Sequence, residues 1–111
     1  MEMAKYIMSI LRTQITVAWS WGLHNPVGVD NGIRFAVQGF KFQGIVEVVY
    51  DEDYDLFNVN FIKAGKVVET VEGVYVDGLI EIIDIYVERT ADYENTVSDY
   101  YKLNFINTAN A

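Results

Sequence analysis

The residues with the clearest chemical potential are three aspartates at alternate positions. Asp51, Asp53 and Asp55 form the Asp-x-Asp-x-Asp opening of a calcium-binding loop. Such a loop also needs a glycine at its sixth position and a bidentate acid at its twelfth. Those positions hold Leu56 and Ile62 in this chain. We therefore interpret the segment as a solvated hairpin tip and expect no metal site.

Other catalytic chemistry has little support. His24 is the only histidine, which excludes a paired-histidine mechanism or a histidine-rich metal site within one chain. There is no cysteine, and the serines lie in neither a Gly-x-Ser-x-Gly nor a Ser-x-x-Lys context. The glycines near residues 28–32 match no phosphate-binding pattern. We expect no catalytic residue, no cofactor and no enzymatic activity. The remaining catalytic alternative is a small enzyme that uses carboxylates such as Asp30 or Asp84.

A second acidic series occurs at helical spacing in the last third of the chain. Its members are four, three and four residues apart: Asp77, Glu81, Asp84 and Glu88. If this segment is helical, the four acids share one side and span about 16 Å, at a rise of ~1.5 Å per residue. The ordinary interpretation is a solvated helix face. The alternative is a negative surface that imitates nucleic-acid phosphates and occupies or inhibits a DNA- or RNA-binding protein.

Tyrosine and tryptophan are abundant, with eight and two copies. Both are over-represented at protein interfaces, because a rigid ring with a polar group can be buried and hydrogen-bonded together. They are also ordinary core and rim residues. The aromatic candidates for partner contacts are Trp19, Trp21, Tyr93, Tyr100 and Tyr101. Since Trp19 and Trp21 are two residues apart, they cannot both face one helix stripe, so one projects sideways or the helix has ended there.

The net charge of −8 is unevenly distributed. Residues 1–46 carry four basic and two acidic side chains, whereas residues 47–111 carry four basic and fourteen acidic ones. Nucleic-acid binding depends largely on lysine and arginine that neutralise phosphates, so we expect no direct nucleic-acid contact. The acidity favours solubility. The length and apolar content fit a single domain over residues 1–111, with residues 106–111 frayed.

The N-terminal segment does not have the features of a membrane anchor or a secretory leader. Its apolar stretch is interrupted by Arg12, Thr13 and Gln14, well short of the ~20 residues that a membrane span requires. The absence of cysteine is compatible with a reducing compartment. We expect a cytoplasmic protein without membrane contact.

The middle of the chain alternates between large apolar and polar side chains. One side collects Ile33, Phe35, Val37, Phe42, Val46, Val48, Tyr50, Phe57, Val59 and Phe61. Such alternation is typical of half-buried antiparallel strands, whose successive side chains point to opposite faces. The connections at residues 39–41, 51–54 and 63–66 fit short hairpins, the first with Gly39 available for a positive φ. With a further strand over residues 67–72, the pattern predicts a four-stranded antiparallel meander.

The opposite side of this predicted sheet is not fully polar. It carries Ile45, Val49, Leu56 and Ile62. Apolar side chains on both faces indicate that something covers part of the second face.

Apolar residues at helical spacing predict helices before and after the meander in the sequence. Residues 2–21 carry an apolar stripe at three- and four-residue steps, ended by Gly22. The β-branched run at residues 15–17 weakens this pattern, so the helix can also end early, with an extended piece after it. Residues 23–31 are then expected to form a loop, with turn residues around Pro26.

Residues 74–89 fit either a hairpin at Asp77-Gly78 or a helix. We favour the helix, with Asp77 as its N-cap, because a strand would place an acid on each face. Tyr93 and Val97 then begin a second helical pattern, with Thr90 as a possible cap. The expected fold is α+β: an N-terminal helix, a four-stranded antiparallel β-meander, and one or two C-terminal helices packed on the sheet.

These features favour a small interaction module that binds a protein partner or itself. Self-association as a homodimer would use the second apolar face of the sheet or the tyrosine-rich tail. The reason is the excess of apolar and aromatic side chains over the few elements available to bury them.

Overall fold

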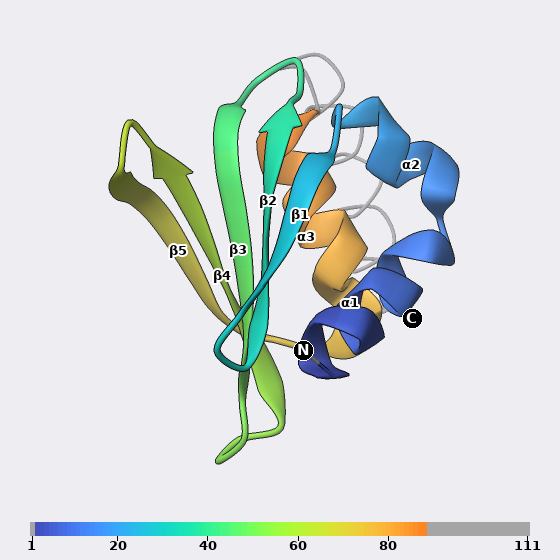
Figure 1. Cartoon of the computed structure of the whole chain (residues 1–111), viewed down its shortest axis with the longest axis vertical. Coiled ribbons are helices and arrows are strands. Elements are labelled where there is room, and N and C mark those ends of the chain that lie inside the picture. The colour runs from blue at the N-terminus through green and yellow to red at the C-terminus, as the bar shows by residue number, and fades with distance from the viewer. Residues whose placement is uncertain (1, 89–111) are drawn as a thin grey trace, which may run out of the picture.

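A computed structural model describes residues 2–88. Its class is α+β, as predicted (Figure 1). The elements in chain order are α1 (Glu2–Arg12), α2 (Ile15–Ser20), β1 (His24–Val29), β2 (Gly32–Gln38), β3 (Gln43–Asp51), β4 (Leu56–Lys63), β5 (Lys66–Val74), a 3-10 turn (Val76–Gly78) and α3 (Leu79–Val87). The predicted tail helix, the frayed end, and Tyr93, Tyr100 and Tyr101 lie outside the described residues.

The five strands form one antiparallel sheet in the order β1-β2-β3-β4-β5. The alternation predicted for β2, β3 and β4 is confirmed, because the residues assigned to the inner face line up across the strands. Phe35 pairs with Val46, and Val46 pairs with Phe61. All three side chains are fully buried. The hairpin at residues 63–66 is also confirmed, with Ala64 and Gly65 both at positive φ.

The prediction of four strands was wrong by one, because β1 lies in the segment that was expected to be a loop. Pro26 and Gly28 are unusual in strands, but proline is tolerated where its missing N–H faces away from the sheet. β1 is an edge strand, and its pairing with β2 is interrupted between His24 and Val27. The turn residues therefore mark an irregular edge. The turn after β1 has Asn31 at φ 58°.

The N-terminal helix is divided in two, which corrects the prediction of one helix over residues 2–21. Thr13 ends α1, since its backbone N–H and its hydroxyl both donate to the Ile10 carbonyl, at 3.0 and 2.6 Å. A second helix then follows, where an extended piece was the expected alternative. Gly22 ends α2 at φ 65°, as predicted. This break directs two short apolar stripes to the core, the first with Ile7 and Leu11 and the second with Ala18.

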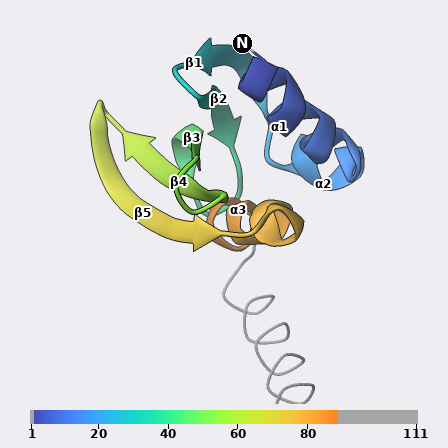
Figure 2. The same ribbon diagram turned by 90° about the horizontal axis from the view of Figure 1, so that it is seen from below.

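All three helices lie on the same side of the curved sheet (Figure 2). Residues 79–87 are helical, which resolves the choice between helix and hairpin. The predicted N-cap is wrong, because Asp77 lies in the preceding 3-10 turn and α3 has no side-chain cap. The buried side chains of α3 are Leu79, Ile80, Ile83 and Val87. Its Tyr86 ring stacks on Phe61 of β4, with 4.0 Å between ring centroids.

The C-terminal end of α3 is fixed to the loop between β2 and β3. The carbonyl of Val87 accepts hydrogen bonds from the backbone N–H groups of Lys41, at 2.9 Å, and Phe42, at 3.2 Å. Gly39 allows this approach because a Cβ there would clash with the Val87 carbonyl and side chain. The need for glycine at this position is therefore close contact, since Gly39 is not among the positive-φ residues.

Candidate functional site

One face of the sheet points away from the helices, and we call it the open face. No helix among residues 2–88 packs on it (Figure 2). Its residues are arranged in rows that cross the strands, and the strand register defines each row.

The first row is apolar. It runs across β2, β3, β4 and β5, because Ala36 pairs with Ile45, Ile45 with Ile62, and Ile62 with Val67. The first three side chains are half-buried, and Val67 is 58% exposed. The sequence prediction of apolar residues on this face is thus confirmed for Ile45 and Ile62, but no described element covers them.

The central row is polar and joined by side-chain hydrogen bonds, and we call it the polar ladder: Arg34, Glu47, Asn60 and Thr70. Arg34 forms an ion pair with Glu47, with 2.6 Å between Nη2 and Oε2. Asn60 donates from Nδ2 to the other Glu47 oxygen at 3.0 Å, and Thr70 donates to Asn60 Oδ1 at 2.8 Å. Four strands are therefore linked through their side chains.

Glu47 is the charged centre of the polar ladder. Burial alone would raise the pKa of Glu47, but the hydrogen bonds from Arg34 and Asn60 and the charge of Arg34 outweigh it. The pKa of Glu47 is consequently lowered, and the side chain is ionised at neutral pH. Its charge is balanced within the row by Arg34.

A third row, made of two valines, a glycine and an asparagine, lies on the other side of the polar ladder. Val29 pairs with Gly32, and Gly32 with Val49. Val49 pairs with Asn58, whose Oδ1 accepts a hydrogen bond from the Gly73 N–H at 3.2 Å. The open face is therefore a hydrogen-bonded polar row with apolar side chains on both sides of it, those of the first row and those of Val29 and Val49.

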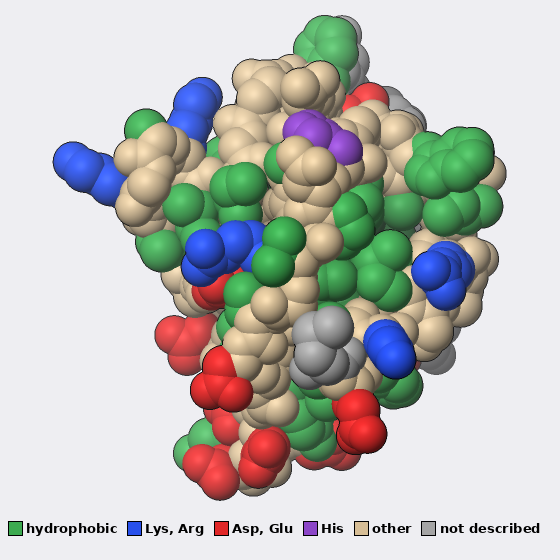
Figure 3. All heavy atoms as spheres, in the orientation of Figure 1, with side chains coloured by type: hydrophobic (Ala, Val, Ile, Leu, Met, Phe, Trp, Pro, Cys, Tyr) green, Lys and Arg blue, Asp and Glu red, His purple; other side chains and the backbone are tan. Residues whose placement is uncertain are grey.

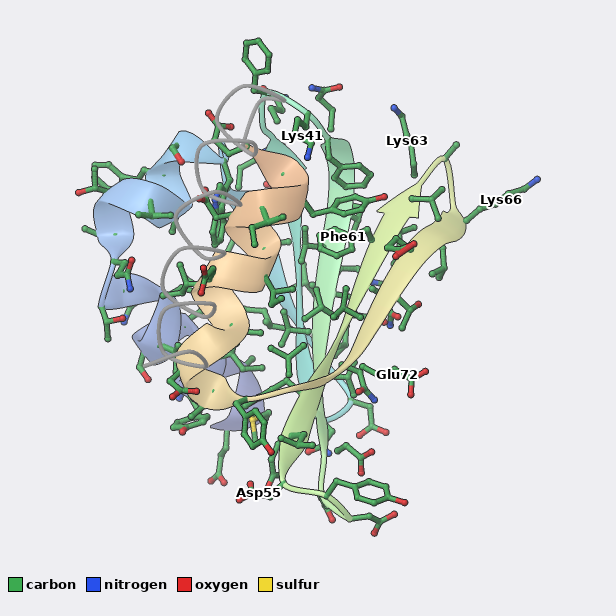
Figure 4. All side chains as sticks on the ribbon, turned by 180° about the vertical axis from the view of Figure 1, so that it is seen from behind. Lys41, Asp55, Phe61, Lys63, Lys66 and Glu72 are labelled. Atoms are coloured by element: carbon green, nitrogen blue, oxygen red, sulfur yellow. The ribbon has the colours of Figure 1, made fainter. Side chains whose placement is uncertain are left out.

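The two edges of the sheet differ. β1 contains Pro26 and a break in its pairing, features that limit the addition of another strand. Within residues 2–88, β5 pairs only with β4, in a register that also shifts twice, and it exposes Val67 and Val68, which are 58% and 50% accessible. Lys63 and Lys66 extend from the hairpin beside this edge (Figure 4).

The two predicted tryptophans have different environments. Trp21 is fully buried, stacks on Phe35 with 6.5 Å between centroids, and donates from Nε1 to Asp84 Oδ1 at 2.9 Å. Trp19 is 72% exposed on α2. The two side chains thus point in different directions, in agreement with their spacing.

The structure does not bring the four predicted acids together as one solvated stripe. Asp77 is exposed in the 3-10 turn. Asp84 bonds to Trp21, and Glu88 accepts a hydrogen bond from the Phe40 N–H at 2.9 Å. Glu81 has a buried oxygen, Oε1, without a hydrogen-bond partner among the described residues. Within residues 2–88 there is no group of three acidic, histidine or cysteine side chains that could hold a metal ion.

Comparisons with protein families, curated proteins and solved structures gave no match to this chain. No helix in the described part is long and apolar enough to cross a membrane.

Proposed function

We propose that this protein is a small cytoplasmic interaction module that associates with a second copy of itself through the open face of its sheet. The observation that carries the proposal is the presence of apolar side chains on both sides of the polar ladder. Apolar area supplies the driving force for association. The hydrogen bonds within the ladder lower its cost of desolvation, because each of its four side chains already has a partner.

Charge balance on this face supports a partner of the same sequence. The whole chain carries −8, so two copies repel each other overall. The central row, in contrast, contains one positive and one negative side chain in direct contact. A two-fold arrangement places the same patch on both copies and needs no further complementarity.

The oligomeric state tests this proposal directly. We expect light scattering after size exclusion to give a mass that rises toward the dimer with protein concentration. Ile45→Lys, in the middle of the first apolar row, should give a monomer because it buries a charge in the contact. Phe40→Lys is the matched control, since Phe40 is 73% exposed in the loop beyond the sheet face. A wild-type protein that stays monomeric at millimolar concentration would contradict the proposal.

The acidic-mimic alternative has less support from the geometry. Mimicry needs negative charges over one continuous exposed surface, whereas Asp84 and Glu88 each accept a hydrogen bond from the protein. Reversing the charge of Asp77 and Glu81 together would test it, through capture of a DNA-binding partner. The carboxylate-enzyme alternative likewise gains no support, as Asp30 lies in the turn after β1 and Asp84 bonds to Trp21.

A further inference from the structure

A cleft at the end of the sheet opposite the β4–β5 hairpin is lined by tyrosines from four separate segments. Tyr6 comes from α1, Tyr50 from β3, Tyr54 from the β3–β4 hairpin, and Tyr75 from the link between β5 and α3. Its volume is about 520 Å³. This lies within the range of roughly 300–1,000 Å³ that is common for small-ligand sites. We call it the tyrosine cleft.

Three of the four rings are largely exposed, although they surround one recess. Tyr6, Tyr54 and Tyr75 are 49%, 75% and 69% accessible. Tyr50 is held in place, since its hydroxyl donates to Asp55 Oδ1 at 2.6 Å and its ring lies 5.4 Å from that of Phe57. Single exposed aromatic residues are ordinary on protein surfaces, but several around one cavity mark a place where a ligand can bury them.

The charge around the tyrosine cleft is negative. Among residues 2–88, Asp55 lines it and no lysine or arginine does. Asp51, Glu52 and Asp53 precede Asp55 on the same hairpin. Acidic side chains gather at this end of the molecule, and the hairpin lysines lie at the other end (Figures 3 and 4).

Aromatic faces and a carboxylate together favour one class of ligand. The face of a tyrosine ring carries partial negative charge and attracts a cation within about 6 Å of the ring centre. Methyl groups on the cation add apolar contact with the same rings and weaken its hydration. We infer that the tyrosine cleft binds an organic cation with an alkylated ammonium head group, with the rings around the head group and Asp55 balancing its charge. This site is separate from the open face and does not depend on self-association.

The test compares two probes of equal shape. Choline chloride and its neutral isostere 3,3-dimethylbutan-1-ol are titrated separately into the ¹⁵N-labelled protein and followed by NMR. We expect choline to shift the amides of Tyr6, Tyr50, Tyr54, Asp55 and Tyr75, and to bind at least about fivefold more tightly than the neutral alcohol. Equal affinity of the two probes, or shifts elsewhere, would overturn the inference.

Two substitutions identify the groups responsible. Asp55→Asn removes the charge and suits the backbone, because Asp55 has φ 55° and asparagine tolerates this region. Tyr75→Leu keeps an apolar side chain but removes the ring. Each should weaken choline binding about two- to fivefold. Phe40→Leu, an exposed aromatic residue in another loop, should leave it unchanged. If both cleft variants bind choline as the wild type does, the inference is wrong.

The protein also provides an internal control. A second cleft, of about 430 Å³, lies between α1 and β1 and is lined by Lys5 and Arg12 beside apolar residues that include Met8. Its positive charge should exclude choline, so the Met8 amide should not shift.

A titration with peptides shows whether the head group belongs to a partner chain or to a free amine. A short peptide with one trimethylated lysine is titrated beside the same peptide with an unmodified lysine. Tighter binding of the trimethylated peptide than of choline assigns the head group to a partner chain, whereas tighter binding of choline assigns it to a free amine. Failure of both probes to bind overturns the inference.

Discussion

Gly39→Ala is expected to destabilise the protein by separating α3 from the β2–β3 loop. A Cβ at residue 39 would lie 2.9 Å from the carbonyl carbon of Val87 and closer still to its oxygen and one of its methyl groups. Real Cβ atoms essentially never approach backbone so closely. The end of α3 must therefore move away from the loop.

The size of the effect follows from the contacts that this movement breaks. The Val87 carbonyl would lose its hydrogen bonds from Lys41 and Phe42, at about 0.5–1.5 kcal/mol each. Val87 is fully buried, so its displacement also disturbs the core. We expect a total loss of roughly 2–4 kcal/mol, which for a domain of this size lowers Tm by on the order of 10 °C or more.

Urea denaturation, followed by the fluorescence of buried Trp21, measures this difference. Gly78→Ala is the matched control because a Cβ there meets nothing within 4 Å, and its stability should stay within ~0.5 kcal/mol of wild type. If Gly39→Ala is as stable as Gly78→Ala, the close approach of α3 to the loop is not a constraint on the fold, and the reasoning fails.

Two further predictions concern buried and paired side chains. Trp21→Phe should cost about 1.5–3 kcal/mol, because it removes the hydrogen bond to the Asp84 carboxylate; Trp19→Phe, at an exposed site, should change the urea midpoint little. Since the pKa of Glu47 is lowered in the folded state, its ionised form contributes stability above the unfolded pKa, and this contribution is lost as pH falls through the folded pKa. Glu47→Gln should therefore be less stable than wild type at pH 7, by less than ~1 kcal/mol because Arg34 is half-exposed. The difference in unfolding free energy between the two proteins should disappear near pH 2. A difference that increases on acidification would contradict the assignment.

The sequence predicted the central strands because burial of one face imposes a two-residue period that the side chains display directly. β1 was missed because Pro26 and Gly28 are local turn signals. They are compatible with a strand only at an edge, and position in a sheet is not a local property. The division of the first helix at Thr13 was missed for a related reason, since the direction of the chain after Thr13 depends on the burial of Ala18 and Trp21 in the core, which is not a local property either.

The candidate sites were accessible from the sequence to different degrees. Alternation placed Arg34, Glu47 and Asn60 on the outer face, but their mutual hydrogen bonds depend on the register between strands, which alternation does not determine. The tyrosine cleft gave no local signal, because its rings come from segments up to 69 residues apart in the chain. The sequence shows the helical spacing of Asp84. The direction of the Asp84 side chain, however, depends on the position of Trp21, which donates a hydrogen bond to it.

The difference between the two sheet edges limits how far copies of this chain can assemble by strand pairing. Among the described strands, β5 is the more receptive edge because it has no proline, although its pairing with β4 also shifts register twice, whereas β1 has both a proline and a break in its pairing. If two molecules were to pair β5 with β5, the more receptive sheet edge of each molecule would be occupied. Growth would then stop at a closed pair, and the same geometry that permits one additional contact opposes the open-ended stacking that leads to fibres.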